Sequence, residues 1–152
     1  MMKTAMVIAV AALALAGCAE KPKIEECWSQ GAKASVQTMI EDWIVEKVRD
    51  DDKSGKFDEA GFRKALKVEL GTFMAMDVNG IGVLQCGANA KATITRNDGT
   101  VLRGGPAPVT FGIYPGENKG SVYQIPNGFA ATKLMQDLEQ SYNRGGEASG
   151  AQ

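Results

Sequence analysis

The chain has 152 residues, with 17 Lys and Arg against 18 Asp and Glu, a formal net charge of −1 and no histidine. The missing imidazole excludes catalytic triads, histidine-based acid–base catalysis and the commonest transition-metal ligand. The even balance of charge leaves no concentrated basic face, so we expect no nucleic acid as a partner. The length suffices for one compact domain.

The first segment of the chain carries the features of a targeting signal. Lys3 precedes an uninterrupted apolar run over residues 5–15. This run is shorter than the about 20 residues that a membrane-spanning helix needs. It has the length of a secretory h-region and ends in small residues and a cysteine, Leu15-Ala16-Gly17-Cys18. The alternative is an ordinary cleaved signal in which Cys18 is incidental.

The motif Leu15-Ala16-Gly17-Cys18 resembles the lipobox of bacterial lipoproteins. The resemblance implies that residues 1–17 are a cleaved signal peptide, that the Cys18 sulfur carries diacylglycerol and that its amine carries a further acyl chain such as palmitate. Two or more acyl chains anchor a protein stably, since each buried methylene contributes about 0.8 kcal/mol. Ala19 stands where inner-membrane lipoproteins of enteric-type bacteria have Asp, which favours the periplasmic side of the outer membrane. Residues 18–26 would then form a lipidated tether.

Two cysteines remain besides Cys18. If Cys18 carries lipid, Cys27 and Cys86 are an even pair in an oxidising compartment, where a disulfide is expected. Two buried thiols are the alternative. We expect a single domain over residues 27–142. Residues 143–152 contain three glycines and no large apolar side chain, which predicts a disordered tail.

Helical periodicity marks the first third of the domain. Apolar residues at steps of three and four predict a long helix that packs on a sheet. These residues are Trp28, Ala32, Val36, Met39, Ile40, Trp43, Ile44 and Val48. A ligand groove lined by tryptophan is the alternative. A second, short helix is expected after Asp58, which serves as its N-cap, with Phe57 and Phe62 packed around its start. Its apolar face should continue to Leu70, and the helix should end at Gly71.

The period then changes to two, which predicts strands. We expect strands over residues 72–78, 84–95, 109–114 and 121–125, with turns at Asn79-Gly80 and Asn97-Asp98-Gly99. Another strand should start at residues 100–103 and be interrupted by Gly104-Gly105-Pro106. Short turns between successive strands predict an antiparallel meander. Phe129, Leu134, Leu138 and Tyr142 predict a short C-terminal helix.

Together these elements predict an α+β fold. A long N-terminal helix and a second short helix pack on a curved antiparallel sheet of about four strands, followed by a short C-terminal helix. The element order loosely resembles small periplasmic lipoproteins with cystatin-like or NTF2-like folds. An NTF2-like fold raises the alternative of an enzyme with an Asp base in a cavity, for which Asp77 and Tyr114 are the polar candidates.

The stretch 50–61 resembles the calcium loop of an EF-hand. Asp50, Asp52 and Ser54 take loop positions one, three and five, and Asp58 takes position nine. Gly61 stands at position twelve, where the standard loop has a bidentate glutamate, so calcium affinity should be weak. The alternative, which we favour, is a solvated acidic connector whose Asp58 caps the next helix.

No nucleophile elbow, phosphate-binding loop, dinucleotide fingerprint or zinc-protease motif occurs in the sequence. We therefore expect a non-enzymatic, lipid-anchored protein without a cofactor that binds another envelope or secreted protein. A weak calcium-binding lipoprotein is one alternative. A small-ligand carrier or NTF2-like enzyme, with a pocket between the long helix and the sheet, is the other.

Overall fold

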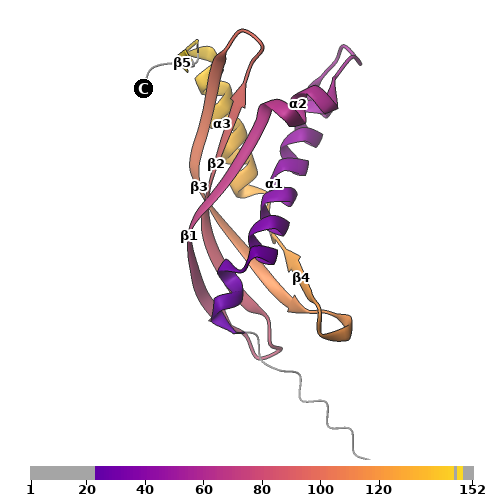
Figure 1. Cartoon of the computed structure of the whole chain (residues 1–152), viewed down its shortest axis with the longest axis vertical. Helices are drawn as coiled ribbons and strands as arrows, with labels where there is room; N and C mark the ends of the chain where they lie inside the picture. The colour runs from indigo at the N-terminus through magenta and orange to yellow at the C-terminus, as the bar shows by residue number, and fades with distance from the viewer. Residues whose placement is uncertain (1–22, 146, 149–152) are drawn as a thin grey trace, which may run out of the picture.

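A curved antiparallel sheet with two helices on one face forms the domain (Figure 1). The computed structural model describes residues 23–145 and 147–148; the predicted signal peptide over residues 1–17, Cys18 and residues 19–22 lie outside the described residues. The elements in chain order are η1 (Ile24–Trp28), α1 (Gln30–Asp51), α2 (Glu59–Ala65), β1 (Leu66–Val78), β2 (Leu84–Thr95), β3 (Thr100–Pro115), η2 (Glu117–Lys119), β4 (Ser121–Gln124), α3 (Phe129–Asn143) and β5 (Glu147–Ala148).

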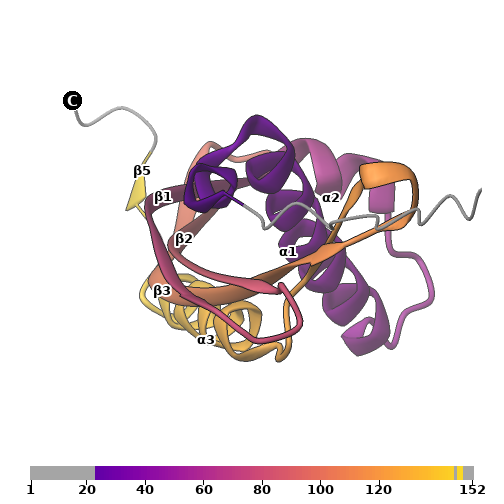
Figure 2. The same cartoon turned by 90° about the horizontal axis from the view of Figure 1, so that it is seen from below.

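The sheet is a meander in the order β1-β2-β3-β4, and each pairing is antiparallel. Short connections make neighbours in sequence neighbours in the sheet, which confirms the predicted α+β fold. Helix α1 contacts both β1 and β4, so the sheet curls partway around it (Figure 2). The short strand β5 pairs with Thr100 and Val101 at the start of β3, inside the stretch that was expected to be a disordered tail.

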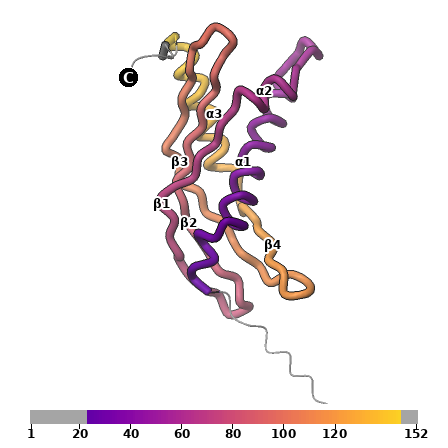
Figure 3. Tube along the Cα trace, viewed as in Figure 1, coloured from indigo at the N-terminus to yellow at the C-terminus, as the bar shows by residue number. Residues whose placement is uncertain are grey.

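Alternation along β2 decides which side chains meet the helices. Leu84, Cys86, Ala88, Ala90 and Ala92 are all buried, as the period of two predicts. They belong to one core that also holds the buried residues of α1, α3 and β3. The small alanines leave room for helices close to the sheet. Figure 3 shows the three long strands running side by side with α1 along them.

Helix α1 starts later than its apolar stripe predicts. Its N-cap is Ser29, whose hydroxyl oxygen accepts a hydrogen bond from the Ala32 backbone N–H at 3.1 Å. Trp28 belongs to the preceding 3₁₀ helix η1 and is 40% exposed, so its predicted place in the helical core stripe is wrong. The central stripe residues Ala32, Val36, Ile40 and Ile44 are buried as expected, together with Val45, whereas Trp43 is only partly buried.

Strand β1 begins at Leu66, where the sequence pattern predicted a helix continuing to Leu70. Leu66 and Val68 are buried opposite Ile94 and Ala92 of β2, while Lys67 between them is exposed. Pairing with β2 overrides the local helical pattern because it satisfies both the backbone and the apolar side chains. The register shifts between Gly71 and Met74, where Thr72 adopts a positive φ of 53°.

Strand β3 runs without a break through Gly104-Gly105-Pro106, so the predicted interruption is wrong. The glycines serve close packing. A Cβ on Gly104 would lie 2.6 Å from the Leu134 carbonyl oxygen, because α3 lies directly on the strand there. Gly105 has a φ of +96°, and its Cβ would meet the Ala90 carbonyl oxygen at 2.6 Å. The irregular backbone appears as a register shift between Ala90 and Ala92.

The structure joins Cys27 of η1 to Cys86 of β2 in a disulfide, with 5.5 Å between their Cα atoms. Both cysteines are fully buried. The link closes a loop with a sequence separation of 59 residues, for which chain entropy predicts about 4 kcal/mol of stabilisation. It ties the start of the domain to a central strand of the sheet.

Helix α3 is tied to β3 by polar contacts beside the Gly104 approach. The Gly105 backbone N–H donates to the Asp137 carboxylate at 3.0 Å, and the Lys133 ammonium lies 2.8 Å from the same oxygen. The Arg103 N–H donates to the Ser141 hydroxyl at 3.1 Å. The Lys133 hydrogen bond, with the backbone bond from Gly105, holds the pKa of Asp137 below its ordinary value of 3.8 despite some desolvation.

We expect Asp137→Asn to lower the free energy of unfolding by about 1 kcal/mol at neutral pH, because it removes the charge that Lys133 and Gly105 N–H contact. A depressed pKa stabilises the fold above the unfolded value of 3.8, and this contribution disappears as the pH falls through the lower folded value. Urea unfolding should therefore separate the two proteins at pH 7 and bring them together near pH 2. The control Asp51→Asn, in an exposed pair with Lys47, should change little. A difference that persists in acid would contradict this assignment.

Candidate functional site

Three adjoining hollows follow the seam between α1 and α3. The first has a volume of about 330 Å³ and lies between Met39, Ile40 and Trp43 of α1 and the residues that lead into α3. The second, of about 670 Å³, lies beside it and shares Trp43. The third, of about 620 Å³, shares Val48, Asp51 and Met135 with the second. Because neighbouring hollows share lining residues, we treat the three as one surface feature and call it the α1–α3 groove.

Trp43 stands at the junction of the first two hollows. Its ring packs against the start of α3, where Gly128 is the N-cap. A Cβ on Gly128 would lie 3.3 Å from the indole nitrogen, so the glycine leaves room for the ring. Because Trp43 is partly buried and lines open space, it combines a fixed orientation with a surface that a partner can contact.

The floor of the second hollow is apolar and its rim is charged. Val48, Ile94, Leu102, Met135 and Leu138 line it from two helices and two strands. Lys47, Asp51 and Glu139 stand on the rim, and Lys47 pairs with Asp51 at 3.0 Å. Glu139 therefore leaves the rim with a net negative charge. Apolar floors with charged rims are typical of surfaces that bind protein segments.

The third hollow lies under the connection between α1 and α2. Phe57 and Phe62 pack with 5.5 Å between their ring centroids, and Asp58 between them accepts a hydrogen bond from the Gly61 N–H at 3.0 Å. The predicted N-cap and aromatic staple of the second helix are thus confirmed. The helix itself is short and gives way to β1 at Leu66.

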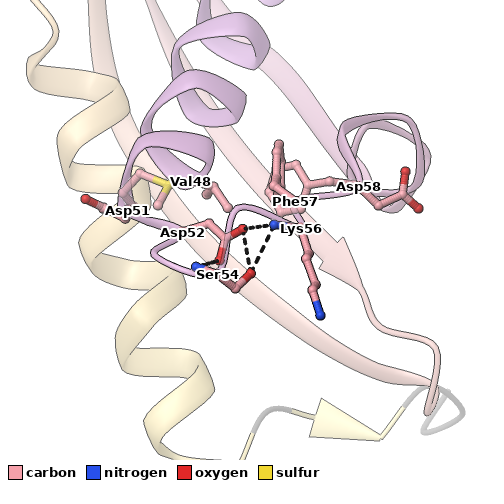
Figure 4. A pocket seen from close by; sticks show the side chains of 9 residues that line it. Val48, Asp51, Asp52, Ser54, Lys56, Phe57 and Asp58 are labelled. Atoms are coloured by element: carbon pink, nitrogen blue, oxygen red, sulfur yellow. Dashed lines mark hydrogen bonds between the residues drawn. The ribbon is translucent and has the colours of Figure 1, made fainter.

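Asp52 organises the loop at the mouth of this hollow (Figure 4). Its carboxylate accepts hydrogen bonds from the Ser54 hydroxyl and the Ser54 N–H, both at 3.0 Å, and from the Lys56 N–H at 3.2 Å. The Ser54 hydroxyl makes the largest contribution, and these bonds together lower the pKa of Asp52 from its ordinary value. The carboxylate thus fixes the backbone N–H groups of Ser54 and Lys56 in the loop that follows α1.

The structure does not gather the four residues of the EF-hand-like pattern. Asp52 and Ser54 lie together, but Asp58 caps α2 and points away from them (Figure 4). Asp50 sits in the last turn of α1, with its carboxylate 3.5 Å from the Arg49 guanidinium. Across residues 23–145 and 147–148, no three His, Cys, Asp or Glu side chains are grouped in a way that could hold a metal ion.

The polar candidates for an enzymatic cavity also lie apart from the groove. Asp77 is exposed on β1 opposite Gln85, and its carboxylate accepts a hydrogen bond from the Val78 N–H. The Tyr114 ring lies over Gly112, on the sheet face away from the helices. Neither residue lines any of the three hollows. Phe111, fully buried, occupies the core between helix and sheet.

Sequence reasoning did not identify the α1–α3 groove, because its lining comes from residues far apart in the chain. Phe129 and Tyr142, predicted for the apolar face of the last helix, are 61% and 56% exposed. One of the lining residues that the sequence did not indicate is Met135, next to the buried Leu134. A helical wheel places it at the edge of the apolar face, and only the position of α1 turns that edge into a groove.

Comparison with known proteins finds no matching family model, no similar curated protein and no similar solved structure. In the part of the chain that the structure describes, none of the helices combines the length and apolar character needed to cross a bilayer. The groove, the disulfide and the sequence motif at Cys18 are therefore the observations from which a function can be argued.

Calcium titration of the protein should give no binding heat at millimolar concentration. The physical reason is that Asp52 and Ser54 bond to each other and to Lys56 N–H, while Asp58 is held at α2. Isothermal calorimetry measures this directly. Binding heat that both Asp52→Asn and Asp58→Asn abolish would contradict the expectation and favour the calcium-binding alternative; Asp77→Asn, at an acid outside the loop, is the control.

Proposed function

We propose that the protein is a lipid-anchored lipoprotein of the bacterial envelope, in which a disulfide-linked α+β domain binds a segment of another envelope or secreted protein in the α1–α3 groove. It acts without catalysis. The observation that carries the proposal is that the start of the described chain and the second and third hollows lie apart in the domain. The described chain starts at one end of the domain, and the connection between α1 and α2 lies at the other end (Figure 1). Residues of this connection line the third hollow, which adjoins the second.

The Leu15-Ala16-Gly17-Cys18 motif supports the anchor, and the Cys27–Cys86 disulfide supports an oxidising compartment. Outer-membrane delivery rests on Ala19. Trp43 and Met135 support protein binding, because tryptophan contributes strongly to interfaces and the flexible methionine side chain adapts to its partner. The net negative charge that Glu139 leaves on the rim favours an apolar segment with basic flanks.

The anchor is tested by fractionation of cells that express the full chain. Cys18→Ser removes the sulfur that would carry diacylglycerol, so the protein should lose its acyl mass and move from the membrane to the soluble fraction. Ala19→Ser is the matched control, because it leaves Cys18 in place and should stay membrane-bound. An unmodified Cys18 in the wild-type protein, measured by intact mass, would refute the anchor.

Binding in the groove is tested by photo-crosslinking in intact envelopes. A photoreactive residue at Gln136, on the groove, should give an adduct with a partner protein, while the same residue at Gln124, exposed on β4, should not. Adding Glu139→Lys should reduce the Gln136 adduct several-fold if the partner segment is basic. Equal adducts from both positions, or none from either in correctly anchored protein, would contradict the proposal.

A further inference from the structure

Exposed apolar side chains gather at the end of the domain where the described chain begins. We call this the anchor-proximal end and define it as residues 23–28, the β1–β2 hairpin 77–83 and the β3–β4 connection 115–120. Nine large hydrophobic residues are markedly exposed in the described part of the chain. Four of them lie at this end: Ile24, Trp28, Val78 and Ile81. Three more lie on the adjoining parts of β1 and β4: Met74, Met76 and Val122.

The three segments share one end of the domain by covalent and backbone links. The disulfide holds η1 against Cys86 of β2. Val78 pairs with Leu84 across the hairpin, and Leu84 pairs with Ile113 near the end of β3. Helix η1 contacts both β1 and β2, and Figure 1 shows η1 and the hairpin together at the lower end.

Ile81 is held outward at the tip of the hairpin. It is 78% exposed, the highest fraction among these seven residues. The Asn79 side-chain oxygen accepts hydrogen bonds from the Ile81 N–H at 3.1 Å and the Val83 N–H at 2.9 Å, which gives the turn a defined shape. A large apolar side chain presented on a structured turn is costly to leave in water, so it points to a surface that covers it.

The length of the tether identifies that surface. From Cys18 to Lys23 the chain spans at most about 17 Å, even when fully extended. Helix α1 alone, with 22 residues, is about 33 Å long. An acylated Cys18 would therefore keep the anchor-proximal end near the lipid headgroups, whichever way the domain rotates about its tether.

We infer that the anchor-proximal end docks on the phospholipid surface, with Ile24, Trp28 and Ile81 inserted at the level of the headgroups. This inference rests on the proposed acylation of Cys18. Tryptophan is favoured at this level, because its ring is apolar and its N–H can bond to polar groups. The end carries acidic Glu25, Glu26, Asp77 and Glu117 against basic Lys23 and Lys119, so apolar insertion drives the contact, and salt should not weaken it.

Docking also orients the α1–α3 groove. Trp43 lies thirteen residues after Gln30, the first residue of α1, so the helix carries it about 20 Å from its start. With the anchor-proximal end on the bilayer, the second and third hollows would face the periplasm and be open to a soluble segment. Membrane docking and partner binding thus use opposite parts of the same domain.

The two tryptophans give a direct test. Acylated protein is purified from membranes and reconstituted in vesicles of zwitterionic phospholipid with brominated acyl chains, which quench only nearby indoles. In Trp43→Phe the remaining Trp28 should lose about half of its emission, because apolar side chains at such surfaces enter about 5–10 Å into the headgroup and acyl boundary. In Trp28→Phe the remaining Trp43 should keep its emission. Ile81→Asp in the first background should restore most of the Trp28 signal.

The outcomes separate this inference from the proposed function. Protein that lacks the acyl mass or does not float with vesicles would refute the anchor itself. Protein that floats with vesicles but shows no Trp28 quenching would support the anchor and overturn docking. If Trp28 were then buried only in native envelopes, this end of the domain would bind a protein partner instead. Equal quenching of both tryptophans would overturn the end-on orientation. Quenching that is lost in high salt would overturn apolar insertion as the driving force.

Discussion

The covalent link between Cys27 and Cys86 joins the entry of the chain to the middle of the sheet. Helix α1 and the central strands adjoin this junction, since α1 follows η1 after Ser29 and β2 pairs with both β1 and β3. A domain of this size buries only a moderate apolar area, so a cross-link worth about 4 kcal/mol is large beside its total stability. The link also places the proposed tether at a fixed end of the domain.

Close contact between backbones decides the position of α3. The absence of a side chain at Gly104 lets the Leu134 carbonyl approach β3, and Asp137 and Ser141 then bond to backbone N–H groups of the same strand. With α3 fixed on β3 and α1 fixed near β1 and β4, the two helices contact each other only partly. The space that remains is the α1–α3 groove, so the candidate site follows from how each helix is attached to the sheet.

The proposals divide the molecule into two working ends. One end holds the proposed tether and apolar side chains that suit a lipid surface, and the other holds a groove with Trp43 and Met135 on its lining. The buried core between them is closely packed, with Phe111, Ile40 and Leu134 almost fully enclosed.

Sequence alone determined the fold class, the alternation of β2 and the cap at Asp58, because each depends on contacts between near neighbours in the chain or on a strict period. It also indicated the Cys27–Cys86 pair by elimination. Tertiary structure decided the rest. Leu66 and Val68 became strand because β2 offered them partners, Gly104-Gly105-Pro106 became continuous strand because α3 packs there, and Trp28 left the core for the surface. The groove was invisible in the sequence because its two walls are set by separate contacts with the sheet, which no local pattern records.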